Sequence, residues 1–235
     1  MPATALHPLQ SDKALPPIRR HITALFILLA TTLAAQQPRT LILLDPAHGG
    51  PDTGAHLPNS ILEKDVTLAF ANRLRSTLTT AGLAVMATRD ADPTALFPPE
   101  QRADIANHAH PTACLLLHAT DNGAPGIHII TSALAPTDPQ RITAWDTAQS
   151  AAIPQSLTLA NALSLALTNA QLPVTITQAF TLPLDNLTCP AVAIEIAPLT
   201  SLGSDPTPVT DPTYQQHIAQ AIAAALTRWH TGAAQ

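Results

Sequence analysis

The feature that most constrains the fold is a short apolar run, Leu41–Leu44, that stops abruptly at Asp45-Pro46 and continues through His48 into two glycines. Four consecutive aliphatic residues between turn signals are typical of a strand buried on both faces. The two glycines then allow the backbone a tight loop. The pattern predicts that His48 lies on a constrained loop at the carboxyl end of a buried strand, where open α/β sheets bind their ligands.

Two later segments repeat this design. The run 113–118 is a second apolar strand and ends at His118, and the run 191–196 is a third and carries Glu195. A carboxylate inside such an apolar strand costs several kcal/mol unless it is paired or bound. We therefore expect the ends of several strands to deliver polar side chains to one edge of one sheet.

Helical patterns alternate with these strands. Ser60 and Glu63 have the spacing of a capping box, an apolar stripe follows them, and Gly82 ends the segment. We expect further helices over 98–109, over 156–170 and from Asp211 onward, and further strands over 83–88, 126–132 and 174–178. The alternation predicts a single α/β domain, a mostly parallel twisted sheet with helices on both faces. Segment 133–155 has little periodicity and is predicted to be a long surface loop or a lid.

Residues 1–38 are predicted to be a leader that precedes the folded domain, 39–235. A pair of arginines stands before the apolar run 22–33, and small residues follow it, as in a signal peptide. The run is shorter than the ~20 residues that span a bilayer comfortably. We expect a cleaved leader and a periplasmic or secreted protein, with membrane attachment only through a leader that stays uncleaved.

Composition excludes some functions and leaves one question open. The formal net charge of −5 indicates no basic surface for nucleic acid. The two cysteines, Cys114 and Cys189, are too few for a disulfide framework, and each stands just before or at the start of a predicted strand. They are expected to be either buried thiols or one bridge between strands.

Four side chains are expected to converge at one edge of the sheet: His48, Glu63, His118 and Glu195. Two imidazoles and one carboxylate form a three-ligand zinc set that leaves a position for water, as catalytic zinc sites require. A further carboxylate nearby could take the proton from that water, a division of labour that suits amide hydrolysis. Simpler interpretations remain, since Glu63 could be a capping glutamate and His118 a hydrogen-bonded strand-end histidine.

Other polar residues near the predicted site are given structural roles. Asp45 is predicted to anchor its loop or to support a ligand. Four further histidines are predicted to be surface or structural residues: His56, His108, His110 and His128.

These residues resemble the zinc-dependent N-acetylmuramoyl-L-alanine amidases of the amidase 3 family, over about Leu41 to Thr227. The stretch that carries Asp45-Pro46-Ala47-His48-Gly49-Gly50, Asp52 and Gly54-Ala55 is similar to the family's first metal motif. Glu63-Lys64-Asp65 is similar to the helix start with its second ligand, His118 to its third ligand, and 190–195 to the strand with its catalytic glutamate.

The resemblance implies that 39–235 is an amidase catalytic domain that cleaves the bond between N-acetylmuramic acid and L-alanine in peptidoglycan. It implies Zn²⁺ on His48, Glu63 and His118, with Glu195 as general base. Peptidoglycan is then the expected partner, and a regulatory activator protein is a further partner that the sequence leaves open.

The chain departs from the family pattern around the expected site, at Ala47, Leu116, Thr120 and 196–199. These departures motivate a second hypothesis, a catalytically weak or inactive envelope protein that keeps the amidase fold and binds peptidoglycan. A zinc peptidase that acts on ordinary peptides is a third hypothesis.

Overall fold

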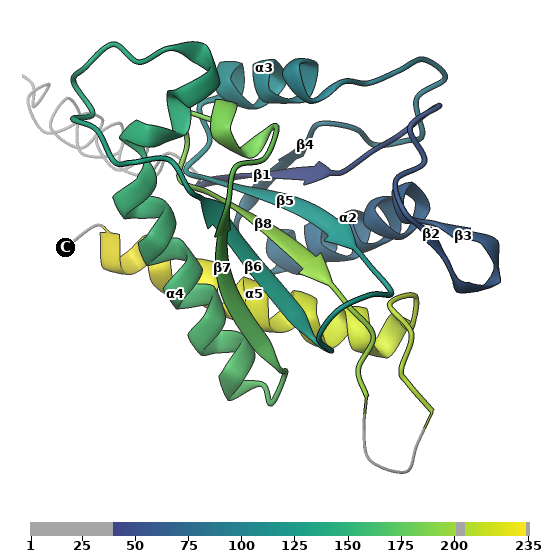
Figure 1. The fold of residues 1–235 in the computed structure, drawn as a ribbon. Coiled ribbons are helices and arrows are strands. Elements are labelled where there is room, and N and C mark those ends of the chain that lie inside the picture. The colour runs from purple at the N-terminus through teal and green to yellow at the C-terminus, as the bar shows by residue number, and fades with distance from the viewer. Residues whose placement is uncertain (1–39, 201–204, 234–235) are drawn as a thin grey trace, which may run out of the picture. The chain divides into compact units, whose positions relative to one another are not determined.

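The computed structural model describes residues 40–200 and 205–233 (Figure 1). The predicted leader, 1–38, lies outside the described residues. The centre of the domain is a six-stranded sheet in the order β4-β1-β5-β8-β6-β7. Its strands are β1 (Leu41–Pro46), β4 (Ala84–Ala87), β5 (Ala113–Ala119), β6 (Ile127–Ser132), β7 (Val174–Ala179) and β8 (Ala191–Ile196).

Four neighbouring strands, β4, β1, β5 and β8, run parallel, which confirms the mostly parallel sheet. β6 runs antiparallel to β8, and β7 runs parallel to β6. The connection from β5 to β6 is only residues 120–126, which is too short for the crossover that a parallel neighbour needs. This reversal brings the amino-terminal end of β6 to the edge where β5 and β8 end.

Helices cover both faces of the sheet, as predicted (Figure 1). One face packs on α2 (Glu63–Thr80), α4 (Ile153–Asn169) and α5 (Pro212–Ala233), and the other packs on α3 (Pro99–Ala109) and η4 (Leu184–Asn186). Side chains alternate between the two, so Leu115 and Leu117 of β5 enter the first layer while Cys114 and Leu116 enter the second. Among the described helices, none combines the length and apolar character needed to cross a bilayer.

The predicted capping box at Ser60 is wrong. Asn59 and Ser60 have left-handed backbone angles, φ 61° and 58°, which a helix cannot continue. They turn a small hairpin between β2 (His56–Leu57) and β3 (Ile61–Leu62), with η2 (Pro58–Ser60) at its tip. α2 therefore begins at Glu63, whose carboxylate is free to turn toward the sheet instead of capping the helix.

Segment 133–155 is not a lid over the predicted zinc ligands. It leaves β6 at the edge where β8 begins, forms η3 (Trp145–Ala151) and enters α4. The buried Gln149 amide donates hydrogen bonds to the carbonyls of Leu187 (2.7 Å) and Cys189 (3.0 Å). The segment therefore supports the chain that enters β8, at the edge opposite to His118.

The two cysteines form one disulfide, Cys114–Cys189. Cys114 lies in β5, and Cys189 lies two residues before the start of β8. The bond lies in the layer between the sheet and α3, and both residues are buried. This resolves the choice between free thiols and a bridge in favour of the bridge, and it ties two strands of the site together.

Candidate metal centre

The loop that carries His48 is fixed from several sides. Its backbone continues β1, because Ala47 N–H donates to the Leu117 carbonyl at 3.0 Å. The buried Arg89 guanidinium donates to the carbonyls of Pro46 (2.9 Å) and Ala47 (3.2 Å), and the Thr67 hydroxyl donates to that of Ala47 at 2.9 Å. His48 itself has φ 64°, a left-handed angle that this scaffold holds in place.

Asp45 anchors the end of β1 and does not support a ligand directly. Its carboxylate accepts hydrogen bonds from the Thr88 hydroxyl (2.6 Å) and from the Arg102 guanidinium (2.7 Å). Both partners of the Asp45–Arg102 ion pair are almost fully buried. This is the loop-anchor role that the sequence predicted as one of two alternatives.

The residue that supports His48 is Asp52, which sequence reasoning did not single out for this role. Both carboxylate oxygens of Asp52 lie 2.9 Å from Nδ1 of His48. Because a carboxylate accepts hydrogen bonds, this contact places the proton on Nδ1 and leaves Nε2 to face the site. The pKa of Asp52 is lowered: burial raises it, but the hydrogen bonds from His48 and the Gly54 amide outweigh burial.

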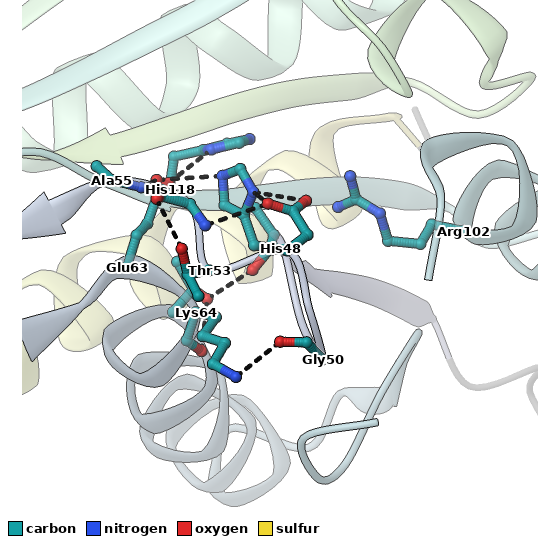
Figure 2. Close-up of polar contacts among 12 residues, drawn as sticks. His48, Gly50, Thr53, Ala55, Glu63, Lys64, Arg102 and His118 are labelled. Atoms are coloured by element: carbon teal, nitrogen blue, oxygen red, sulfur yellow. Dashed lines mark hydrogen bonds and ion pairs between the residues drawn. The ribbon is translucent and has the colours of Figure 1, made fainter. Parts of the chain in front are cut away.

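His48, Glu63 and His118 converge on one point, with one candidate ligand atom from each, all within 4.8 Å of one another. The Glu63 carboxylate lies between the rings, 3.1 Å from Nε2 of His48 and 2.9 Å from Nδ1 of His118 (Figure 2). The Ala55 amide donates to the same carboxylate at 2.8 Å. The three side chains come from the loop after β1, the start of α2 and the end of β5.

The electrostatics of this cluster favour an ionised Glu63. Burial raises the pKa of Glu63, but hydrogen bonds from His118, His48 and the Ala55 amide outweigh burial and hold the pKa well below its usual range. The Glu63 carboxylate in turn raises the pKa of His48 above its usual value, against the opposing effect of burial. A deprotonated carboxylate that faces two imidazoles is electrostatically suited to a cation.

The donor set fits zinc. Zinc is bound by histidine nitrogen and carboxylate oxygen, and three protein ligands are typical of its catalytic sites. The Asp52 contact fits too, because a ligating histidine almost always donates its other ring N–H to a carboxylate, carbonyl or water. Both imidazoles keep partly exposed side chains, 23% for His48 and 27% for His118, so solvent and substrate can reach this point.

Glu195 lies beside His118 but belongs to a different strand. The two residues are paired in register across β5 and β8. In-register neighbours project from the same face of a sheet, here the face that α3 covers farther along the strands. The side chain of Glu195 is 32% exposed, so water can reach its carboxylate.

The four histidines that were predicted to be surface or structural residues fall into two groups. His56 lies on the hairpin and contacts the Thr53 hydroxyl, and His108 contacts Asp104 on an exposed turn of α3, as the prediction of surface roles requires. His110 follows the end of α3. His128 is different, because β6 places it next to Glu195.

A shallow cleft opens beside the cluster, where the chain leaves β5 and β8. It consists of two adjoining cavities of about 380 and 120 Å³ that share four lining residues: Pro58, Asp121, Pro198 and Pro208. A larger cavity of about 740 Å³ lies around the start of α5. None of these three cavities is lined by any of the four predicted site residues, so the cavities do not mark where a substrate would approach the candidate ligands.

Comparison with known families decides what kind of domain carries this site. Residues 42–228 match the model of the Amidase_3 family, described as N-acetylmuramoyl-L-alanine amidase. The chain belongs to this family. The match begins in β1 and ends in α5, so it includes every residue of the candidate site.

Among characterised proteins, the germination-specific N-acetylmuramoyl-L-alanine amidase of Bacillus subtilis (strain 168) is 38% identical over 91 residues. That match covers 33% of this chain and 38% of the relative, so the chain matches well under half of that protein.

Solved structures share the fold. The catalytic domain of CwlV, an N-acetylmuramoyl-L-alanine amidase from Bacillus (Paenibacillus) polymyxa var. colistinus, is 22% identical with a TM-score of 0.62, over 82% of this chain and 98% of that chain. The CwlD amidase of Clostridioides difficile, solved in complex with the GerS lipoprotein, is 20% identical with a TM-score of 0.62, over 83% of this chain and 100% of that chain. At these identities the likeness concerns the fold.

Proposed function

We propose that this chain is a zinc-dependent hydrolase that cleaves the amide bond between N-acetylmuramic acid and L-alanine in peptidoglycan. His48, Glu63 and His118 would hold the zinc, and Glu195 would act as general base. The observation that carries the proposal is the convergence of three ligand atoms within 4.8 Å, with Glu195 in register beside His118. Family membership supports the choice of substrate.

The chemistry of the donor set supports amide hydrolysis. Zinc bound there would polarise the amide carbonyl and make a nearby water more acidic. Glu195 would accept a proton from the water whose oxygen bonds to the carbonyl carbon. The carbon–nitrogen bond then breaks, and Glu195 would return the proton to the amine of L-alanine. Its partial exposure and its position beside His118 suit this exchange.

The fixed loop supports a positioning role for the residues around the ligands. Asp52 would keep the Nε2 lone pair of His48 directed at the metal, and the Ala55 amide would hold the Glu63 carboxylate. Arg89 and Thr67 would keep the loop carbonyls from moving. Such support matters because a small displacement of a reacting group can cost about 10²-fold in rate.

The direct test is digestion of purified peptidoglycan sacculi by the full chain, followed by mass spectrometry of the products. The proposal expects free stem peptides with an amino-terminal L-alanine and glycan strands with intact lactyl groups. Chelation should abolish the release, and zinc should restore it. Release of amino acids from within stem peptides would instead favour a peptidase, and binding to sacculi without any release would favour the non-catalytic envelope protein.

We further propose that the chain acts outside the cytoplasm, as its substrate requires, and that residues 1–38 direct its export. An activator protein is part of the proposal because an amidase of the same fold, CwlD, was solved with a lipoprotein. Mass spectrometry of the mature amino terminus after fractionation of expressing cells would test the leader, and an uncleaved Met1 in the cytoplasm would exclude it.

A further inference from the structure

Four side-chain positions form one row across the sheet. His118 of β5 pairs with Glu195 of β8, Glu195 pairs with His128 of β6, and His128 pairs with Thr175 of β7. In-register positions share a face, so the carboxylate of Glu195 has an imidazole on each side. Nδ1 of His128 lies 3.8 Å from Oε2 of Glu195, and the side chain of His128 is only 18% exposed.

The other ring nitrogen of His128 already makes a hydrogen bond. Nε2 lies 2.7 Å from the carbonyl oxygen of Ala124, in the loop between β5 and β6. A carbonyl only accepts hydrogen bonds, so Nε2 carries a proton. The loop also lies close to the ring, since a Cβ on Gly123 would be 3.7 Å from its Cε1. His128 therefore has a fixed orientation in which Nδ1 faces Glu195.

This orientation has a chemical consequence. A neutral ring with its proton on Nε2 would present a lone pair on Nδ1 to a carboxylate, and two acceptors that face each other repel. The contact becomes attractive when one more proton is present, either on Nδ1 or on the Glu195 carboxyl. At 3.8 Å the two atoms are within ion-pair distance of one another, with room for a small movement or a bridging water to complete a hydrogen bond.

We infer that His128 is a positioning residue for Glu195: its ring, held by the Ala124 carbonyl, orients the carboxylate beside the metal centre. The inference rests on the proposed function, in which Glu195 is the general base. The other neighbours in the row are His118, on the far side of Glu195, and Thr175, which is neutral. His128 is thus the neighbour of Glu195 in this row that is not one of the proposed zinc ligands.

The alternative to positioning Glu195 is a purely structural role, in which His128 only holds the loop through the Ala124 carbonyl. Two variants distinguish the positioning role from this structural role. In His128→Gln the longer amide can still donate to the Ala124 carbonyl, but no ring nitrogen faces Glu195. In His128→Asn the shorter amide can donate toward Glu195 but falls short of Ala124. His108→Gln on an exposed turn of α3 is the matched control for the loss of an imidazole.

The experiment measures kcat, KM and bound zinc for the full-length zinc-loaded protein and these three variants. We expect His128→Gln to lower kcat about two- to fivefold, the effect of losing a partly exposed polar contact to a carboxylate, with KM and zinc content unchanged. His128→Asn should lose less than His128→Gln, and His108→Gln should match wild type.

The opposite order, with His128→Asn more damaged than His128→Gln, would overturn the inference in favour of loop anchoring. So would a loss of zinc or a rise in KM alone. If the wild type releases no stem peptides at all, the proposed function fails, and the pairing is then tested without turnover. The ring ¹⁵N shifts of His128 should change in Glu195→Gln, and identical shifts would overturn the pairing.

Discussion

Gly54 offers a sharp test of the metal centre because it touches the cluster without contributing a side chain. Its φ is +64°, and a Cβ added there would lie 2.6 Å from both Oε2 of Glu63 and Cδ2 of His48. Gly82, after the end of α2, has a similar φ of +87° but has nothing within 4 Å of an added Cβ. Alanine at either position has a strained left-handed backbone, and only at Gly54 does it collide with candidate ligands.

The two effects differ in size and in kind. Left-handed backbone costs an L-residue about 1–2 kcal/mol, so Gly82→Ala should lower the free energy of unfolding by about that amount. In Gly54→Ala the Glu63 carboxylate must also move by about 1 Å to restore ordinary contact distances. Ligand distances in metal sites tolerate roughly 0.2 Å. We therefore expect zinc affinity to fall by about 100-fold, the upper end of the range for altered ligand support.

Competition with a chromophoric chelator measures zinc affinity, and chemical denaturation of the metal-free proteins measures stability. The prediction is that Gly82→Ala loses stability but binds zinc like wild type, whereas Gly54→Ala loses both. Equal zinc affinities in the two variants would refute the placement of Glu63 and His48 around Gly54.

Three further predictions address the ligands and the base. Glu195→Gln should lower kcat by about 100-fold or more with zinc content unchanged, measured by muropeptide release and metal analysis, and full activity would exclude Glu195 as the base. Asp52→Asn should weaken zinc binding by about 10–100-fold in chelator competition, and unchanged affinity would show that the contact to His48 is dispensable. In metal-free protein, the lowered pKa of Glu63 means that its carboxylate stabilises the fold at pH values above its ordinary pKa of 4.5, and this stabilisation is lost as pH falls toward the lowered pKa. The raised pKa of His48 means that its imidazolium stabilises the fold at pH values below its ordinary pKa of 6.5, and this stabilisation is lost as pH rises through the raised pKa. The cluster should thus contribute most to the melting temperature between these values, and a Glu63→Gln profile of the same shape would contradict this.

The sequence was most informative where strands end. Three buried apolar runs follow from hydrophobic patterning: one is followed by the loop with His48, one ends at His118, and one contains Glu195. A polar residue in such a run needs a partner. The parallel sheet and the helices on both faces follow from the alternation of elements.

Features that depend on loop conformation were not predictable in the same way. Ser60 and Glu63 have capping-box spacing, but the left-handed angles of Asn59 and Ser60 form a hairpin instead. The contact between Asp52 and His48 depends on a four-residue loop with no periodic pattern. A histidine followed four residues later by an aspartate in a glycine-rich loop was the signal that could have suggested it.

The contact between His128 and Glu195 could not be predicted because it depends on the register of β6 against β8. His128 was predicted to be a surface or structural residue within a strand, and the sequence does not show which neighbour it meets. The antiparallel pairing of β6 with β8 brings it opposite Glu195. A shift of one residue would have turned the same ring to the other face of the sheet.

If His48, Glu63 and His118 hold one zinc ion, the metal content of the purified full chain should differ sharply from that of His118→Ala. We expect one zinc per wild-type chain and almost none in the variant after brief exposure to a chelator. Wild-type protein without zinc, or a variant that retains zinc as well as wild type does, would contradict it.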